Sequence, residues 1–200
     1  MNRRTFLAVC AAALVPGCAS TSIVNQWQSP DPGPAFTKLL VVGVSRSASV
    51  RRVFEDEMVK ALQARGVTAI PSYTLIPEDG PVSDTRLAEA VQKSGVDGVL
   101  TTRVLQVAQQ VQVVGPGPTF WGPPWGFYSW YWGAWGPVYT YSPQVLTSDI
   151  VYAEVRLFRA KPDTLVWAAT TESFAPRDVR RESADFARIV IGQLAELKLI

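Results

Sequence analysis

Lys38-Leu39-Leu40-Val41-Val42-Gly43-Val44 decides the fold, because it is a short, continuous apolar run. A run of this kind is typical of a central strand that is buried on both faces of a sheet. After a turn at residues 45–49, apolar residues recur at helical spacing from Val50 to Leu62, with charged residues on the opposite side. We therefore expect a strand followed by an amphipathic helix, which Gly66 ends as its C-terminal cap.

The order of strand and helix repeats further along the chain. Residues 67–73 predict a second strand, which its proline shortens or kinks. Ser83 or Asp84 begins a second helix, and Gly95 ends it. A third strand opens at residues 97–105, so the first half of the domain is predicted to be βαβαβ with right-handed crossovers.

Long antiparallel strands are expected next. The third strand alternates without a helical period, and one of its faces is expected to carry Val99, Thr101, Arg103, Leu105, Val107, Gln109, Val111 and Val113. Residues 149–159 and 165–174 also read as strands, and a turn at residues 160–163 joins them. A last amphipathic helix is expected from about Asp178, its N-cap, to Leu197.

Together these elements predict an α/β fold, in detail an α+β two-layer sandwich. We expect a mixed sheet of about five strands in the order β-α-β-α-β-β-β-α, with helices mainly on one face and a long aromatic-tipped hairpin. Residues 37–200 are expected to form this single domain, which is long enough to build its own core.

Residues 1–17 have the three-part layout of a secretory signal peptide. Two arginines precede an apolar run of ten residues, Phe6 to Val15, which is too short to span a membrane. Cys18 directly follows the small residue that ends this layout. The pattern resembles the lipobox of bacterial lipoproteins, in which the cysteine receives a diacylglyceryl group, becomes the N-terminus and is acylated on its amino group. The alternative is an ordinary signal peptide, with Cys18 a bystander.

Cleavage would change the composition of the chain. Nineteen basic residues would become 17, because two arginines leave with residues 1–17, and would match the 17 acidic residues. Cys18 would be the only cysteine left, so the domain would have no disulfide. Several acyl chains, palmitate among them, would anchor the chain to a membrane in an effectively permanent way.

The residues after the cysteine bear on location. Ala19 and Ser20 include no aspartate that would act as an inner-membrane retention signal, so the resemblance implies the outer membrane, with the domain facing the periplasm. Residues 18–36 are polar and proline-rich, and they are expected to be the lipidated N-terminus and a flexible tether. Adjacent arginines near the start also resemble the twin-arginine export motif, and the general export route stays open beside it.

The chain holds no histidine and only two cysteines. These counts exclude Ser-His-Asp and Cys-His nucleophiles, His-ligated zinc and Cys₄ metal sites. The formal net charge of +2 is too small and too evenly spread for a nucleic-acid binder. We expect no enzyme, no cofactor and no metal; a hydrolase that uses carboxylates alone is the least favoured alternative.

Two stretches contain residues that a chemical site could use. Ser45 follows the first strand without a G-x-S-x-G motif, although the end of such a strand is a conventional place for a binding crevice. The pairs Arg51–Glu55 and Arg52–Asp56 have i,i+4 spacing, which favours a solvated helix face over a paired-carboxylate active site.

An uncharged aromatic insert interrupts the second half of the chain. Residues 104–148 hold no charged residue, and residues 120–141 hold eleven aromatic ones. Glycine and proline interrupt the insert, at about residues 114–144, so often that we expect it to be the irregular tip of the hairpin. At about 150–250 Å² each, these side chains offer more surface than a soluble monomer leaves uncovered. The candidate contact residues are Trp121, Trp125, Tyr128, Trp130, Tyr131, Trp132 and Trp135.

Several different surfaces or ligands could bury the aromatic side chains of the insert. The insert could pack on its own domain without a dedicated ligand, meet an envelope protein or another copy of the chain, stack on glycan, or lie at the lipid interface. It contains no lysine or arginine, which argues against a platform for anionic lipid or single-stranded nucleic acid.

Four phrases carry a family resemblance. They are KLLVVGV (38–44), FEDEMVKALQARGVTAIPSYTLIP (54–77), GVDGVLTTRV (95–104) and YAEVRLFRAKPDTLVWAATTESF (152–174). They resemble a set of uncharacterised bacterial envelope lipoproteins. The element order is more distantly similar to the curli-secretion lipoprotein, the lipoprotein activators of penicillin-binding proteins and the N-terminal domain of TolB. The resemblance implies fold and compartment, and no functional residue is carried over from it.

These observations lead to one functional hypothesis. We expect a non-enzymatic outer-membrane lipoprotein that is a periplasmic binding or assembly module, with contacts through the aromatic insert. Its partners would be the membrane, through Cys18, and an envelope protein or a second copy of the chain. The alternative is a glycan- or peptidoglycan-binding lipoprotein.

Overall fold

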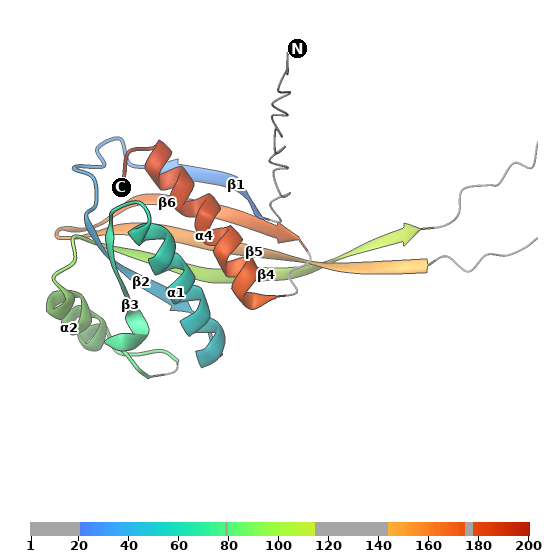
Figure 1. The fold of residues 1–200 in the computed structure, drawn as a ribbon, viewed down its shortest axis with the longest axis horizontal. Helices are drawn as coiled ribbons and strands as arrows, with labels where there is room; N and C mark the ends of the chain where they lie inside the picture. The colour runs from blue at the N-terminus through green and yellow to red at the C-terminus, as the bar shows by residue number, and fades with distance from the viewer. Residues whose placement is uncertain (1–20, 79, 115–143, 175–177) are drawn as a thin grey trace, which may run out of the picture.

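A mixed sheet of six strands, in the order β1-β6-β5-β4-β2-β3, carries the fold. The computed structural model describes residues 21–78, 80–114, 144–174 and 178–200 (Figure 1). Its elements are β1 (Thr21–Gln28), β2 (Lys38–Val44), α1 (Ala48–Gln63), β3 (Thr68–Pro71), the 3-10 turn η1 (Ser72–Thr74), α2 (Asp84–Ser94), β4 (Gly98–Val114), β5 (Gln144–Ala160), β6 (Asp163–Phe174) and α4 (Val179–Glu196).

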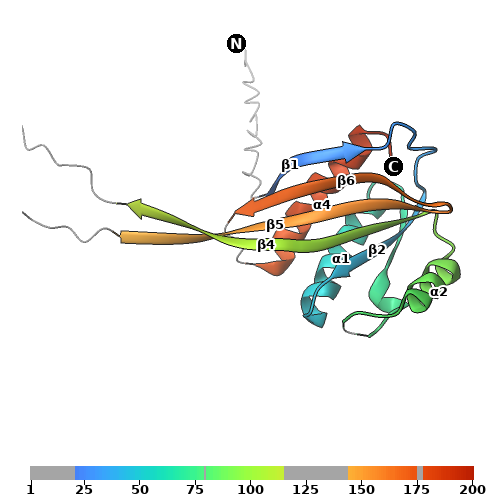
Figure 2. The ribbon, with the colours of Figure 1, turned by 180° about the vertical axis from the view of Figure 1, so that it is seen from behind.

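The predicted α/β fold with a mixed sheet is confirmed. β2 pairs in parallel with β3 and β4, whereas β4, β5, β6 and β1 pair in antiparallel order. α1 and α4 lie side by side over one face of the sheet, and α2 lies apart from them near β3 (Figures 1 and 2). The crossovers β2–α1–β3 and β3–α2–β4 run in opposite directions across the sheet, so their right-handedness places α1 and α2 on opposite faces.

The main core lies between this helix pair and the sheet. Alternate residues of each strand supply it, because successive side chains point to opposite faces. Trp167 of β6 is its largest fully buried side chain, and Phe186 of α4 packs edge-on against Phe54 of α1, with ring centroids 5.4 Å apart. The two helices therefore meet through aromatic rings above the sheet.

The helix ends predicted at Gly66, Gly95 and Asp178 are confirmed by backbone geometry and hydrogen bonds. Gly95 ends α2 in the left-handed conformation with φ 60°, and the Asp178 side chain accepts a hydrogen bond from the backbone of Arg181 at 2.9 Å. The regular part of α1 ends at Gln63, and Gly66 closes its last turn as predicted. Gly66 has φ 82° and donates its backbone N–H to the carbonyl of Gln63 at 3.0 Å, while Val67 donates to the carbonyl of Leu62 at 3.1 Å.

The prediction of a flexible tether over residues 18–36 is wrong from Thr21 onward. Residues 21–28 form β1, which pairs with β6 at the edge of the sheet and brings the strand count to six. Ile23 packs against the core, and Gln26 accepts a hydrogen bond from the indole of Trp167 at 3.2 Å. The polar composition of residues 21–28 led to the wrong prediction, because an edge strand has one solvated face and needs few apolar residues.

The prediction that alternate residues of the third strand share one face is also wrong beyond Arg103. Val104 pairs with Ala153, and Gln106 pairs with Tyr152, so Leu105 is an extra residue in β4. Such a β-bulge reverses the alternation that follows it. The positions after Leu105 are therefore moved to the opposite face from the one expected.

Candidate functional site

One end of the sheet brings four strands into a single transverse row. Thr21 of β1 pairs with Ser173 of β6, Ser173 with Val151 of β5, and Val151 with Val107 of β4. β2 ends close to this row, and both α1 and α4 begin there (Figures 1 and 2). We call this the open end of the domain. The described chain thus starts at the same end of the sheet as the N-termini of the two helices.

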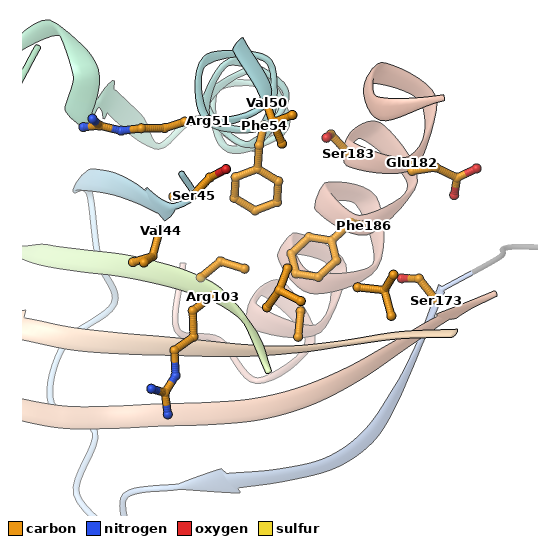
Figure 3. A pocket seen from close by; sticks show the side chains of 15 residues that line it. Val44, Ser45, Val50, Arg51, Phe54, Arg103, Ser173, Glu182, Ser183 and Phe186 are labelled. Atoms are coloured by element: carbon orange, nitrogen blue, oxygen red, sulfur yellow. The ribbon is translucent and has the colours of Figure 1, made fainter. Parts of the chain in front are cut away.

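A cavity of about 190 Å³ lies at the open end, between the two helices and the sheet. Its apolar walls come from every neighbouring element: Val44, Val50, Phe54, Val104, Val151 and Phe186. Figure 3 shows the two phenylalanine rings facing this space from α1 and α4. Gly43, Ala153 and Thr102 add small surfaces from three strands, so the cavity is bounded by parts of the chain that are far apart in sequence.

Gly43 lets α1 approach the sheet at this point. A Cβ atom on this residue would lie 3.2 Å from the Cδ1 atom of Phe54, which is tighter than ordinary side-chain contact. The strand end that the sequence marked as a usual crevice position therefore does border a cavity. Ser45 lines it beside Gly43, and nothing in its described surroundings activates its hydroxyl.

The charged groups of the lining residues point away from the cavity (Figure 3). The Arg103 guanidinium lies on the other face of the sheet, where its Nε is 2.7 Å from Oε2 of Glu154. The carboxylate of Glu182 also points outward. The Arg51 guanidinium is turned toward η1, so the surface left to the cavity is largely apolar.

Arg51 and Glu55 are paired as predicted, but the expectation of a solvated face is wrong for them. Glu55 is fully buried, and its Oε1 accepts from Arg51 Nε at 3.1 Å, from Ser72 Oγ at 2.7 Å and from the backbone of Gly43 at 2.9 Å. Its other oxygen accepts from the backbone of Tyr73 at 3.0 Å. The carboxylate thus ties β2, α1 and η1 together, and its acceptor sites are used for structure.

Arg51 completes this network with two further hydrogen bonds. Arg52 and Asp56, the second predicted pair, both contact Tyr73. The Arg51 guanidinium donates to the carbonyl oxygens of Ile76 and Glu78 at 3.0 and 2.9 Å. Asp56 accepts a hydrogen bond from the Tyr73 hydroxyl at 2.7 Å, which is the main cause that raises the pKa of Tyr73. Arg52 lies over the ring of Tyr73, 5.8 Å from its centroid.

The opposite face of the sheet carries a charged cluster of Arg103, Glu154 and Arg156. Arg156 Nη2 lies 2.7 Å from Oε1 of Glu154, and this hydrogen bond is the main cause that lowers the pKa of the Glu154 carboxyl. Arg103 lowers it further through the other oxygen. The cluster is an ion-pair arrangement on a solvated face, with two cations sharing one carboxylate.

The rim of the cavity is apolar and exposed. Seven of the ten exposed large hydrophobic side chains of the described residues lie at the open end: Val44, Val50, Val104, Leu105, Val107, Phe174 and Val179. Val104 and Val107 both pair with β5 residues that line the cavity, so they extend its wall outward on the same face. An apolar surface therefore continues from the cavity to solvent.

The predicted contact residues belong to the part of the chain that the structure does not describe. Trp121, Trp125, Tyr128, Trp130, Tyr131, Trp132 and Trp135 lie outside the described residues, as does Cys18. Sequence reasoning missed the cavity, because Phe54 and Phe186 read only as parts of two apolar helix stripes. Gly43 at a strand end was the one signal that could have pointed to it.

The described residues contain neither a metal-binding cluster nor a helix that could cross a membrane. No group of three or more cysteine and carboxylate side chains in residues 21–78, 80–114, 144–174 and 178–200 could hold a metal ion. In the same part of the chain, no helix combines the length and the apolar character needed to cross a membrane.

Comparisons with known proteins were made at the level of sequence and of structure. No family model matches the sequence. No curated protein matches it either. Among solved structures, the chain is similar to a PelC dodecamer from Paraburkholderia phytofirmans, with 12% identity, a TM-score of 0.47, and coverage of 90% of this chain and 99% of that chain. A variant of that dodecamer, in which one leucine is replaced by methionine, matches with 13% identity, a TM-score of 0.47, and coverage of 86% and 96%.

A third similar structure is the lipoprotein GNA1162 from Neisseria meningitidis. It matches with 15% identity and a TM-score of 0.43, over 82% of this chain and 99% of that chain. What the site of the present chain binds therefore has to follow from its own residues.

Proposed function

We propose that the chain is a lipid-anchored protein of the cell envelope that works without catalysis, as a binding or assembly module. The observation that carries this proposal is the ribbon formed by β4 and β5. β6 pairs with β5 as far as Ile150, and beyond that point six further pairs join β4 and β5, from Gln109 with Asp149 to Val114 with Gln144. At about 3.3 Å per residue this ribbon projects roughly 20 Å from the sheet (Figure 1).

A two-stranded ribbon of this kind needs to contact another surface in order to be stable. Isolated two-stranded hairpins are marginally stable in water, because their backbone hydrogen bonds are exposed and they bury little apolar surface. The ribbon leads into the uncharged aromatic insert, which by its composition also calls for a cover. A partner protein or a second copy of the chain that holds the ribbon and the insert would meet both needs.

The anchor belongs to the same proposal. Cys18 precedes Thr21 by three residues, so acyl groups on its sulfur and amino group would attach the open end of the domain to a membrane. The residues after Cys18 favour sorting to the outer membrane, with the domain in the periplasm.

Replacement of Cys18 by alanine tests the anchor alone. We expect the Cys18→Ala chain to lose incorporation of radiolabelled palmitate and to accumulate as a soluble periplasmic product or as uncleaved precursor. Labelling and fractionation of cells expressing each form measure both effects. An unchanged membrane fraction that still carries palmitate would refute the assignment of Cys18.

Crosslinking in living cells tests the binding role. We expect the intact chain to crosslink to one envelope protein or to a second copy of itself, and the product to disappear when residues 118–142 are deleted or replaced by a glycine-serine segment of equal length. Trp27→Ser is the matched control, since Trp27 is an exposed aromatic residue outside the insert. This control should leave the product unchanged.

Three outcomes would contradict the binding role as stated. A crosslinked product that survives replacement of the insert would move the contact elsewhere. Binding to purified sacculi without any protein partner would favour the glycan-binding alternative. Turnover of a glycoside that a single carboxylate substitution abolishes would make the protein an enzyme.

A further inference from the structure

We infer that the cavity at the open end accepts one acyl chain. This assignment rests on the proposed lipid anchor for its source of lipid, and on the described residues for the site itself. The cavity combines apolar walls, charged groups that point away from it, and an apolar rim that opens to solvent. An amphiphile with a slender apolar tail has the chemistry that matches all three features.

The first described residue after the proposed attachment point, Thr21, lies next to the cavity. The Thr21 hydroxyl is 2.8 Å from the hydroxyl of Ser173, and Ser173 lines the cavity. Cys18 is three residues before Thr21, a distance that an extended chain spans in about 10 Å. Acyl groups on Cys18, and the bilayer that receives them, are thus brought within reach of the rim.

The volume of the cavity is suited to part of one hydrocarbon chain. A volume of about 190 Å³ exceeds the roughly 150 Å³ of an apolar cavity that binds benzene, but it is below the roughly 300–1,000 Å³ of pockets for drug-sized ligands. Part of one hydrocarbon chain fits such a space, whereas a nucleotide is too large for it. The apolar lining also offers few hydrogen-bonding groups to a polar ligand.

The rim distinguishes this cavity from a packing defect. Val44 is 63% exposed and Val104 is 56% exposed, and both line the cavity as well as its mouth. Val107 continues the apolar surface outward along β4. A void sealed in a core has no such path, while a chain that enters from a membrane needs one.

Two sources can supply the same chemistry. One is an acyl group on Cys18 of the same molecule, and the other is a phospholipid of the bilayer. Photocrosslinking separates them, because a diazirine can be placed on either chain.

In the first arm, lipidated protein is reconstituted into phosphatidylethanolamine and phosphatidylglycerol vesicles that contain a phosphatidylcholine with a diazirine on one acyl chain. In the second arm, the protein is lipidated in cells fed a diazirine fatty acid and is then purified into unlabelled vesicles. After irradiation, we expect photoproducts on the tryptic peptides 53–60 and 182–188, which carry Phe54 and Phe186. The arm that yields them identifies the source.

Variants make the result specific to the cavity. Ala153→Phe fills the cavity from β5, and Val104→Asp puts a charge in its mouth at an exposed position that should not affect folding. Each should lower the photoproduct on these peptides about tenfold, the effect of excluding about two methylene groups. Ala168→Phe adds the same ring on the opposite face of the sheet and should leave the yield unchanged.

The inference is overturned if neither arm labels the two peptides, or if labelling persists in the folded Val104→Asp chain. Mass spectrometry of the N-terminal peptide keeps this outcome separate from the proposed function. An N-terminus without acyl groups refutes the anchor, and the first arm then still decides whether the cavity takes a bilayer chain. An acylated N-terminus without labelling of peptides 53–60 and 182–188 refutes the cavity assignment alone.

Discussion

The two ends of the sheet differ in how far their apolar side chains are covered. At the end where β2 begins, Phe36 is 2% exposed and lies under the guanidinium of Arg159, 4.1 Å from the ring centroid. Arg159 also donates to the carbonyl of Pro34 at 2.7 Å. The Asp97 carboxylate accepts from both the backbone and the hydroxyl of Thr37 at 2.8 Å. The apolar ring of Phe36 is therefore covered by a side chain from another segment.

At the open end the same sheet keeps an apolar surface in contact with solvent. Val44, Val104 and Val107 are each more than half exposed, and a cavity lies behind them. The comparison shows that the chain has residues able to seal an end, and that it uses them at one end only. We therefore expect a ligand or a membrane to cover the apolar surface of the open end.

The largest expected effect is at the sealed end. Phe36→Ala should lower the free energy of unfolding by about 3–5 kcal/mol, because it removes a buried ring and leaves a cavity. Val107→Ala at the open end should change it by less than about 0.5 kcal/mol, since that side chain is largely exposed. Denaturant unfolding of the Cys18→Ala chain gives both values. An equal decrease in the free energy of unfolding at the two positions would contradict the difference between the two ends.

An intermediate effect is expected from adding volume. Ala153→Val extends into the cavity and should raise the free energy of unfolding by about 0.5–2 kcal/mol in the Cys18→Ala chain. Ala169→Val makes the same change at a filled position of β6 and should cost about 1–3 kcal/mol. Thermal and denaturant unfolding measure both. A loss of stability in both variants would mean that the cavity has no room for added atoms.

The smallest effect concerns the charges on the far side of the open end. The Arg156 and Arg103 guanidiniums lower the pKa of Glu154, so the stability that they confer is present above its ordinary pKa and is lost as the pH falls through the lowered value. Both arginines are largely exposed, which limits the contribution to less than about 1 kcal/mol. Glu154→Gln should remove this part of the acid dependence while leaving ligand binding in the cavity unchanged. Unfolding curves from neutral to acidic pH test it, and an identical pH dependence in both chains would contradict the assignment.

Local signals in the sequence were enough for most of the fold. The apolar run of β2 and the caps at Gly95 and Asp178 each depend on residues close together in the chain, and each was predicted correctly. β1 was missed because its outer face is polar and a proline-rich segment follows it. The bulge at Leu105 was missed because the register of β4 is set by its partner strand.

The site was harder to predict than the fold. The cavity depends on the approach of Phe54 to Phe186 and on the absence of a side chain at Gly43, three positions that no sequence pattern connects. The position of the cavity near the proposed anchor depends on β1, so the wrong prediction of a tether concealed that relation as well. The pair Arg51–Glu55 shows the converse case, in which the spacing predicted the contact but could not predict its burial.

The pairing of β1 with β6 also decides how mechanical force would enter the domain. A pull transmitted from a membrane through Cys18 would act on Thr21 along the axis of β1, while the hydrogen bonds of an antiparallel ladder lie across that axis. The load would be shared by the whole ladder in shear, and the bonds would not open one after another. With Cys18 anchored as proposed, this edge strand would act as a strap that bears the load and protects the core and the open end.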